Sequence, residues 1–272
     1  MALTSYFVNP VTSGAANTKG AYAAFVASTP YDCSRLFLMV RGTSVANRFL
    51  LFDLAIGAAS AETVVVANIA VGDGADFVIG AFVEINVDIP MGSRVSMRCQ
   101  SVTASTVAAV ALMLENRALG ALTAPVTYGA NTAASRGTQI DPGAVISTKG
   151  AYVEFSASTP ARIDAVMLCA TVNAQAAAIA SGTVWSVDVA TGGSGSETVV
   201  IPDLLYIANS TDDKVSPGLI RIPVSIPAAT RLAVRCDCNR NTATERLLCL
   251  TVIGMQEPAA SGSGQRSVAY LG

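Results

Sequence analysis

An internal duplication constrains this chain more than any other feature of its sequence. The segment from Thr18 to Pro30 (TKGAYAAFVASTP) returns as Thr148 to Pro160 (TKGAYVEFSASTP). Two further matches follow in the same order, an Asp-centred stretch ending in Glu-Thr-Val-Val and a stretch of the form Ile-Pro…Arg…Arg-Cys. The period is far too long for a solenoid, so the three collinear matches predict two tandem domains of the same fold.

The duplication sets the predicted domain boundaries. We expect copy one over residues 1–117 and copy two over residues 136–256. Residues 118–135 (ALGALTAPVTYGANTAAS) are small and uncharged and contain one proline, which favours a linker or an extended arm. Residues 257–272 are rich in turn-forming residues and are predicted to be a mobile tail or a tail that docks on a neighbouring subunit.

Each copy is predicted to be all-β. Val83, Ile85, Val87 and Ile89 alternate with polar residues, which is the period of a half-buried strand. The equivalent strand of copy two, around residues 220–226, contains Pro223. Proline has no backbone N–H to donate to a neighbouring strand, so this strand should lie at a sheet edge or carry a bulge. Seven or eight short strands per copy, separated by turn residues, predict two tandem jelly-roll-like β-sandwich domains. One segment, 174–180 (AQAAAIA), is ambiguous between helix and strand.

The composition excludes several classes of function. The chain contains no histidine, which removes the commonest general base and the commonest metal ligand. Only 13% of its residues are charged and its net charge is −2, so no basic surface is expected for nucleic acid or for an acidic membrane. We therefore expect no catalytic residue, no cofactor, no metal and no enzymatic activity.

The six cysteines are Cys33, Cys99, Cys169, Cys236, Cys238 and Cys249. They form no CxxC pair, and a disulfide framework is typical of smaller secreted domains. Cys236 and Cys238 point to one face of a predicted strand, with no histidine or second pair to complete a metal site. We expect six reduced thiols in a protein made in the cytoplasm, with Cys99 and Cys236 in the cores.

Charged residues at twin positions are the candidate site residues. They are Lys19 and Lys149, Asp53 and Asp188, Glu62 and Glu197, and Arg98 and Arg235. The chain has only three lysines, and two of them are twins. The favoured interpretation is that each lysine, together with Glu62 or Glu197 and Arg98 or Arg235, makes a structural charge pair that ties loops together. The alternative is that these residues contact a neighbouring subunit. A catalytic pair would have to occur twice.

The repeated motifs resemble a repeat found in structural proteins of tailed bacteriophages. The matching residues run from Lys19 to Tyr22, from Ala27 to Pro30, from Asp53 to Val65 and from Ile89 to Gln100, together with their twins in copy two. The resemblance covers most of both copies, and its motifs are structural. It implies a virion component of the kind associated with tails or tail fibres.

The resulting hypothesis is a non-enzymatic virion protein, assembled in the host cytoplasm and placed at the tail tip, baseplate or fibre-attachment region. A capsid decoration or head-spike protein is the first alternative. A module that binds carbohydrate on the host surface is the second; it would need exposed aromatic side chains, whereas Trp185 lies in an apolar run typical of a core. The expected partners are other virion proteins and further copies of the chain. Because few charged residues cover the surface, we expect a homo-oligomer, a trimer or a ring.

Overall fold

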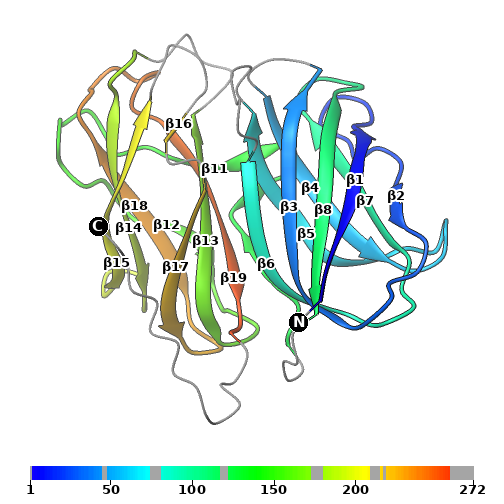
Figure 1. Cartoon of the computed structure of the whole chain (residues 1–272). Helices are drawn as coiled ribbons and strands as arrows, with labels where there is room; N and C mark the ends of the chain where they lie inside the picture. Colours follow the sequence, from blue (N-terminus) through cyan, green and yellow to red (C-terminus); the bar gives the residue numbers. More distant parts are fainter. Residues whose placement is uncertain are drawn as a thin grey trace.

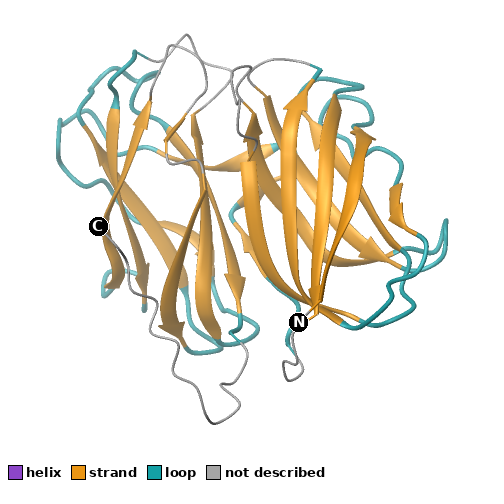
Figure 2. Cartoon of the chain, in the orientation of Figure 1, coloured by secondary structure: helices purple, strands orange, loops and turns teal. Residues whose placement is uncertain are grey.

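In the computed structural model, residues 2–44, 48–73, 81–116, 122–172, 180–208, 215–216 and 219–257 are described. Throughout these residues the chain is all-β (Figures 1 and 2). It forms two β-sandwich units side by side, each made of two antiparallel sheets. The predicted fold class, two tandem β-sandwich domains from a duplication, is confirmed. No described helix is long and apolar enough to cross a membrane.

Copy one contains the sheets β1-β8-β3-β6 and β2-β7-β4-β5. Its strands are β1 (Ala2–Thr12), β2 (Ala23–Val26), β3 (Cys33–Thr43), β4 (Arg48–Ile56), β5 (Thr63–Asp73), β6 (Ala81–Ile89), β7 (Val95–Ser101) and β8 (Val107–Asn116).

Copy two contains the sheets β10-β11-β19-β13-β17 and β12-β18-β14-β15-β16, with β9 also paired to β19. Its strands are β9 (Val126–Tyr128), β10 (Ala130–Asn131), β11 (Arg136–Ile140), β12 (Val153–Ser156), β13 (Ile163–Val172), β14 (Val184–Thr191), β15 (Thr198–Ala208), β16 (Val215–Ser216), β17 (Leu219–Ile226), β18 (Leu232–Cys238) and β19 (Leu248–Met255). The order β19-β13-β17 repeats β8-β3-β6, and β12-β18-β14-β15 repeats β2-β7-β4-β5, as the duplication predicts.

The inward strand faces form the two cores. Alternate residues of β6, from Val83 to Ile89, are fully buried, as their period of two predicts. Trp185 is also fully buried, and its indole Nε1 donates to the carbonyl of Arg246 at 2.7 Å. Pro223 lies on β17, which is the last strand of its sheet, and the β13–β17 register shifts beside it. Both expectations for Pro223 are confirmed.

The predicted linker, 118–135, differs from the expectation. Its residues 126–131 form β9 and β10, which pair with β19 and β11 and so extend a sheet of copy two. The reason is local: Tyr128 is buried in the core of copy two, and this burial fixes a short strand that small, uncharged neighbours do not reveal. The ambiguous segment 174–180, apart from Ala180, and the tail, apart from Glu257, lie outside the described residues.

The two copies share an apolar contact. Ala165, Met167, Ile253 and Met255 of copy two are buried in the same cluster as the core residues of copy one. These four side chains lie on the outer face of the β19-β13-β17 sheet, which packs against the edge of copy one formed by β5 and β6. The contact fixes the two sandwiches to each other as neighbours within one chain.

Candidate functional site

The first charge centre, which we define as Lys19, Tyr22, Asp53 and Arg98, forms around one carboxylate. The side chain of Asp53 is only 5% exposed. Its Oδ1 accepts from Lys19 Nζ at 2.7 Å and its Oδ2 accepts from Arg98 Nε at 2.9 Å. The Arg98 guanidinium in turn lies over the Tyr22 ring, 4.7 Å from its centroid, which is a cation–π geometry.

A β-bulge supplies the remaining donor to Asp53. The β4–β5 register shifts opposite Asp53, and Asn68 takes a left-handed conformation with a φ of 55°. This conformation directs the Asn68 backbone N–H to Asp53 Oδ1 at 3.0 Å. Burial alone would raise the pKa of Asp53, but the hydrogen bonds from Lys19, Asn68 and Arg98 outweigh it and hold the pKa below its ordinary value.

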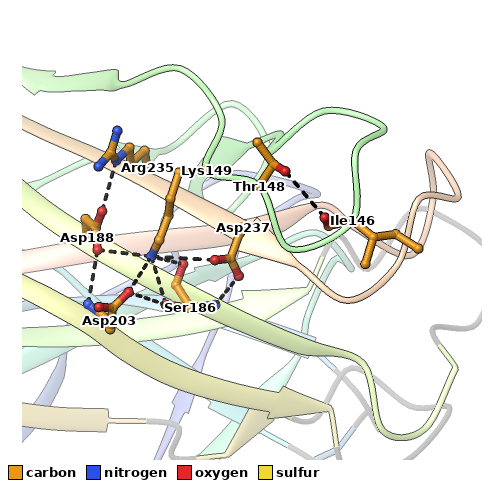
Figure 3. Close-up of polar contacts among 8 residues, drawn as sticks. All are labelled: Ile146, Thr148, Lys149, Ser186, Asp188, Asp203, Arg235 and Asp237. Atoms are coloured by element: carbon orange, nitrogen blue, oxygen red, sulfur yellow. Dashed lines mark hydrogen bonds and ion pairs between the residues drawn. The ribbon is translucent and has the colours of Figure 1, made fainter.

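The second charge centre is the twin of the first and comprises Lys149, Asp188 and Arg235, which Figure 3 shows, together with Tyr152. Asp188 accepts from Lys149 Nζ at 3.0 Å and from Arg235 Nε at 2.9 Å. Arg235 lies 4.5 Å from the centroid of the Tyr152 ring. The backbone N–H of Asp203, at the equivalent bulge, donates to Asp188 at 3.0 Å. Burial again opposes these contacts, and they hold the pKa of Asp188 below its ordinary value.

The second centre has three polar groups that the first lacks. Lys149 Nζ also contacts Asp203 Oδ1 at 3.1 Å, Ser186 Oγ at 2.8 Å and Asp237 Oδ2 at 3.9 Å (Figure 3). At the position of Ser186, two residues before the central aspartate, copy one has Leu51, whose carbonyl accepts from Lys19 at 2.9 Å. Among the described residues, Lys149 therefore has three carboxylates nearby, whereas Lys19 pairs with a single carboxylate.

A second twin contact lies in each copy. Arg94 pairs with Glu62 at 3.0 Å and donates to the Gly57 carbonyl at 3.2 Å. Arg231 repeats this with Glu197 at 3.0 Å and with the Gly192 carbonyl at 3.1 Å. Gly57 and Gly192 have φ of 116° and 103°, a backbone conformation that other residues rarely adopt.

The repeated motifs also contain a backbone constraint. A Cβ at Gly20 would lie 1.9 Å from the carbonyl oxygen of Thr12, and one at Gly150 would lie 2.7 Å from Pro142 Cα. Only glycine permits these close approaches. In front of each lysine, Thr18 and Thr148 donate to the carbonyls two residues earlier. The Thr-Lys-Gly motif is thus a tight turn that delivers a lysine to the central aspartate.

The ion pairs differ in partner from the sequence-based interpretation. The predicted side chains do form charge pairs, but Lys19 and Lys149 pair with Asp53 and Asp188 rather than with Glu62 and Glu197. The glutamates pair with Arg94 and Arg231, which are not among the predicted site residues.

The threonines of the Ala-Ser-Thr-Pro motif were also missed. Thr29 and Thr159 are 1% exposed and donate to the carbonyls of Pro90 and Pro227 at 2.8 and 3.0 Å. Their position in a repeated motif was the available signal.

The cysteines and acidic groups offer no alternative site among the described residues. All six cysteines are free and buried, and Cys99 and Cys236 lie in the cores as predicted. Burial raises the pKa of Cys33 to about 11 and that of Cys99 to about 12, so neither is a thiolate at neutral pH. No group of three or more metal-ligating residues occurs within the described part of the chain.

No protein-family model matches the chain, and no curated protein matches it in sequence. Several solved structures are similar in fold. PNGF-II is 7% identical with a TM-score of 0.40, and the match covers 96% of this chain but only 66% of that one. PNGase F, a glycosylasparaginase from Flavobacterium meningosepticum, is 8% identical with a TM-score of 0.43, covering 95% and 99% of the two chains.

The tandem CBM22-1–CBM22-2 domains of Paenibacillus barcinonensis Xyn10C are 10% identical with a TM-score of 0.31, covering 94% of this chain and 93% of theirs. At such identities and TM-scores these likenesses identify neither a family nor an activity.

Proposed function

We propose that this chain is a non-enzymatic structural protein of a bacteriophage particle, placed at the tail tip, baseplate or fibre-attachment region. The assignment to a phage particle and to its tail rests on the resemblance of the repeated motifs to those of phage structural proteins. The observation that carries the structural role is that the central aspartate of each copy binds a lysine and an arginine of its own copy.

The chemistry of these centres favours a structural role over catalysis. A general base or nucleophile needs a free lone pair directed at a substrate. In both centres the carboxylate accepts from a lysine, an arginine and a backbone N–H. Because the twin centres are alike in this respect, they serve the same purpose, which is to fix the Thr-Lys-Gly turn to the sheet.

The described aromatic side chains favour the structural role over glycan binding. Sugar rings stack on exposed aromatic faces, and the exposed large hydrophobic side chains of the described residues are all aliphatic or Met. Tyr22 and Tyr152 already stack on arginines, and Trp185 is buried. Aliphatic side chains at the surface are suited to contacts with other proteins.

Labelling of particles tests the proposal. Antibody raised against the purified chain, followed by gold-conjugated secondary antibody, should label intact particles of the encoding phage at the tail end. Particles of an unrelated phage serve as the control. Label on the head would favour the decoration or head-spike alternative. Particles that carry no label, and in which no peptides of the chain are detected, would contradict a virion role.

An activity assay tests the non-enzymatic part. The purified chain should release no product from host polysaccharide or peptidoglycan, and Asp53→Ala and Asp188→Ala should behave identically to the unchanged protein. Cleavage that either substitution abolishes would overturn this part of the proposal. A glycan array addresses the remaining alternative, since specific binding there would favour a carbohydrate-binding module.

A further inference from the structure

The contact between the two copies uses a different surface of each copy. Copy one contributes the edge formed by β5 and β6 together with Leu51 of β4 and Ala70 of β5, which are buried outside the sandwich core. Copy two contributes an outer sheet face, in which Cys169 of β13 and Leu219 of β17 pack in the same cluster as Leu51 and Ala70. We call these surfaces the edge and the face. Because the copies have equivalent strand orders, each copy also has the strands that correspond to those the other one uses.

The equivalent surface of copy two is exposed in part: β16 pairs with the end of β15 at Ile207 and Ala208, and Ser186 stands in the place of Leu51. The bulge residues Asn68 and Asp203 donate to the central aspartates in the same way, so they are equivalent, and the twin of Ala70 is Leu205. Ala70 is 1% exposed, whereas Leu205 is 56% exposed. Ile207, two residues farther along β15, is 40% exposed. The strand that carries them, β15, lies on the side of copy two away from copy one (Figure 1).

The face of copy one is exposed in part as well. Cys33 and Ile163 begin the equivalent strands β3 and β13 and pair with Ile89 and Ile226, so the twin of Cys169 is Met39. Cys169 is 2% exposed and Met39 is 37% exposed.

The cross-strand pair next to this position shows the same difference. Met167 and Ile253 are paired and buried in the contact, at 3% and 0% exposure. Their twins Phe37 and Met113 are paired in the same way on β3 and β8 and are only half-buried. The outer face of this sheet therefore presents exposed apolar side chains next to the ion pairs of Arg35 with Glu84 and Glu115.

We propose that the edge of copy two in one chain docks on the face of copy one in a second copy of the chain. This head-to-tail contact would repeat between chains the contact that joins the two copies within one chain. Leu205 would take the place of Ala70, and Met39 that of Cys169. A heterologous contact of this kind closes into a ring when the rotation between successive chains allows it, and otherwise continues as a filament.

Exposed apolar side chains on both surfaces support this occupant. Leu205 and Met39 are exposed, whereas their twins Ala70 and Cys169 are buried together in the contact between the copies. Exposed aliphatic and Met side chains on a sheet lose contact with water when a second apolar surface covers them, which favours association. The proposal does not depend on the phage role, because it concerns the purified chain alone.

The first test is the oligomeric state of the full-length purified chain. Light scattering coupled to size exclusion, run over a concentration series, should show masses that are multiples of one chain. Leu205→Glu and Met39→Glu should each reduce the mass to that of a single chain, since each removes one of the two surfaces. Met91→Glu is the matched control, because Met91 is 66% exposed and lies outside both surfaces, and it should leave the oligomer unchanged.

The decisive measurement mixes the two variants. Leu205→Glu retains an intact face and Met39→Glu retains an intact edge, so an equimolar mixture should form a heterodimer and nothing larger. A symmetric dimer through the face would predict that Leu205→Glu alone still dimerises. A monomeric wild type, an unchanged oligomer in either variant, or a mixture that stays monomeric would each overturn the proposal. The fluorescence of Trp185 and the thermal transition establish that every variant is folded.

Crosslinking gives an independent readout that does not depend on a destabilising charge. A chain with Leu205→Cys mixed with a chain with Met39→Cys should form an interchain disulfide on mild oxidation by copper phenanthroline, because the twin residues Ala70 and Cys169 share one cluster. The pair Met91→Cys with Met39→Cys should not crosslink. Equal crosslinking of both pairs would count against the specific contact.

Discussion

The twin charge centres allow a stability experiment in which one molecule supplies its own control. In Asp53→Asn the side chain keeps its size and loses its charge, so Lys19 and Arg98 lose their anionic partner. Breaking a buried ion pair by removing one partner costs about 3–5 kcal/mol. Lys19 and Arg98 are 16% and 32% exposed, so water recovers part of this, and we expect a cost of about 2–3 kcal/mol.

Asp188→Asn should cost about half as much. Lys149 keeps the carboxylate of Asp203 at 3.1 Å and the hydroxyl of Ser186 at 2.8 Å, and both continue to compensate its charge. The first centre has no such reserve, since the residue equivalent to Asp203 is Asn68. The prediction is an asymmetry between two variants that are otherwise matched in fold, burial and chemistry.

Differential scanning calorimetry measures the effect. At about 2–4 °C per kcal/mol, Asp53→Asn should lower Tm by about 4–12 °C and Asp188→Asn by about half of that. The fluorescence of Trp185 identifies the transition of copy two. Glu154→Gln, which removes a half-exposed partner of Arg231, is the surface control and should shift Tm less than either.

The reasoning has a further consequence that can refute it. The double variant Asp188→Asn/Asp203→Asn removes the reserve, so its cost should approach that of Asp53→Asn. Conversely, Asn68→Asp should reduce the cost of Asp53→Asn by giving Lys19 a second carboxylate. Equal costs for the two single variants, or a larger cost for Asp188→Asn, would refute the idea that the neighbouring carboxylates decide the outcome.

Three other predictions concern the central aspartates, the cysteines and Trp185. In the folded chain the pKa values of Asp53 and Asp188 lie below the ordinary value of 3.8. The stabilisation from these carboxylates is therefore complete above that pH and is lost as the pH falls through the folded pKa values. Tm should decline in acid, and the decline should be shallower in the double variant Asp53→Asn/Asp188→Asn. Thiol titration should count six cysteines in denaturant without reductant and show almost none reacting in the folded chain, and a count below six would contradict free thiols. Trp185→Phe should destabilise the chain by about 2–4 kcal/mol in chemical unfolding monitored by circular dichroism, because it leaves a cavity and an unpaired carbonyl at Arg246.

The fold could be predicted because its determinants are local and occur twice. The alternation from Val83 to Ile89 fixes which face is buried, and Pro223 limits its strand to an edge. The twin motifs identify equivalent strands whatever their order in space. β9 was missed because it is held by the burial of Tyr128, which depends on the position of β19 and cannot be read from neighbouring residues.

The candidate residues could be predicted, but their pairing could not. Duplication singled out Lys19, Asp53, Glu62 and Arg98 as residues that matter to both copies. Which carboxylate meets the lysine depends on the register of β4 with β7, where Asp53 lies opposite Arg98. Register is set by side-chain packing and turn geometry over a whole sheet, and no short motif contains it. Glu62 lies just before β5 and pairs with Arg94 instead.

The residues that the two copies share have a different structural role from the residues in which the copies differ. The shared residues hold turns and bulges that any such sandwich needs, from the Thr-Lys-Gly turn to the arginine that stacks on tyrosine. The residues that differ include those at the contact surfaces. Ala70 and Cys169 are small where the copies touch, and their twins Leu205 and Met39 are larger and exposed. At these two positions the internal contact is built from small side chains, whereas an interchain contact at the twin surfaces would be built from longer, more adaptable ones.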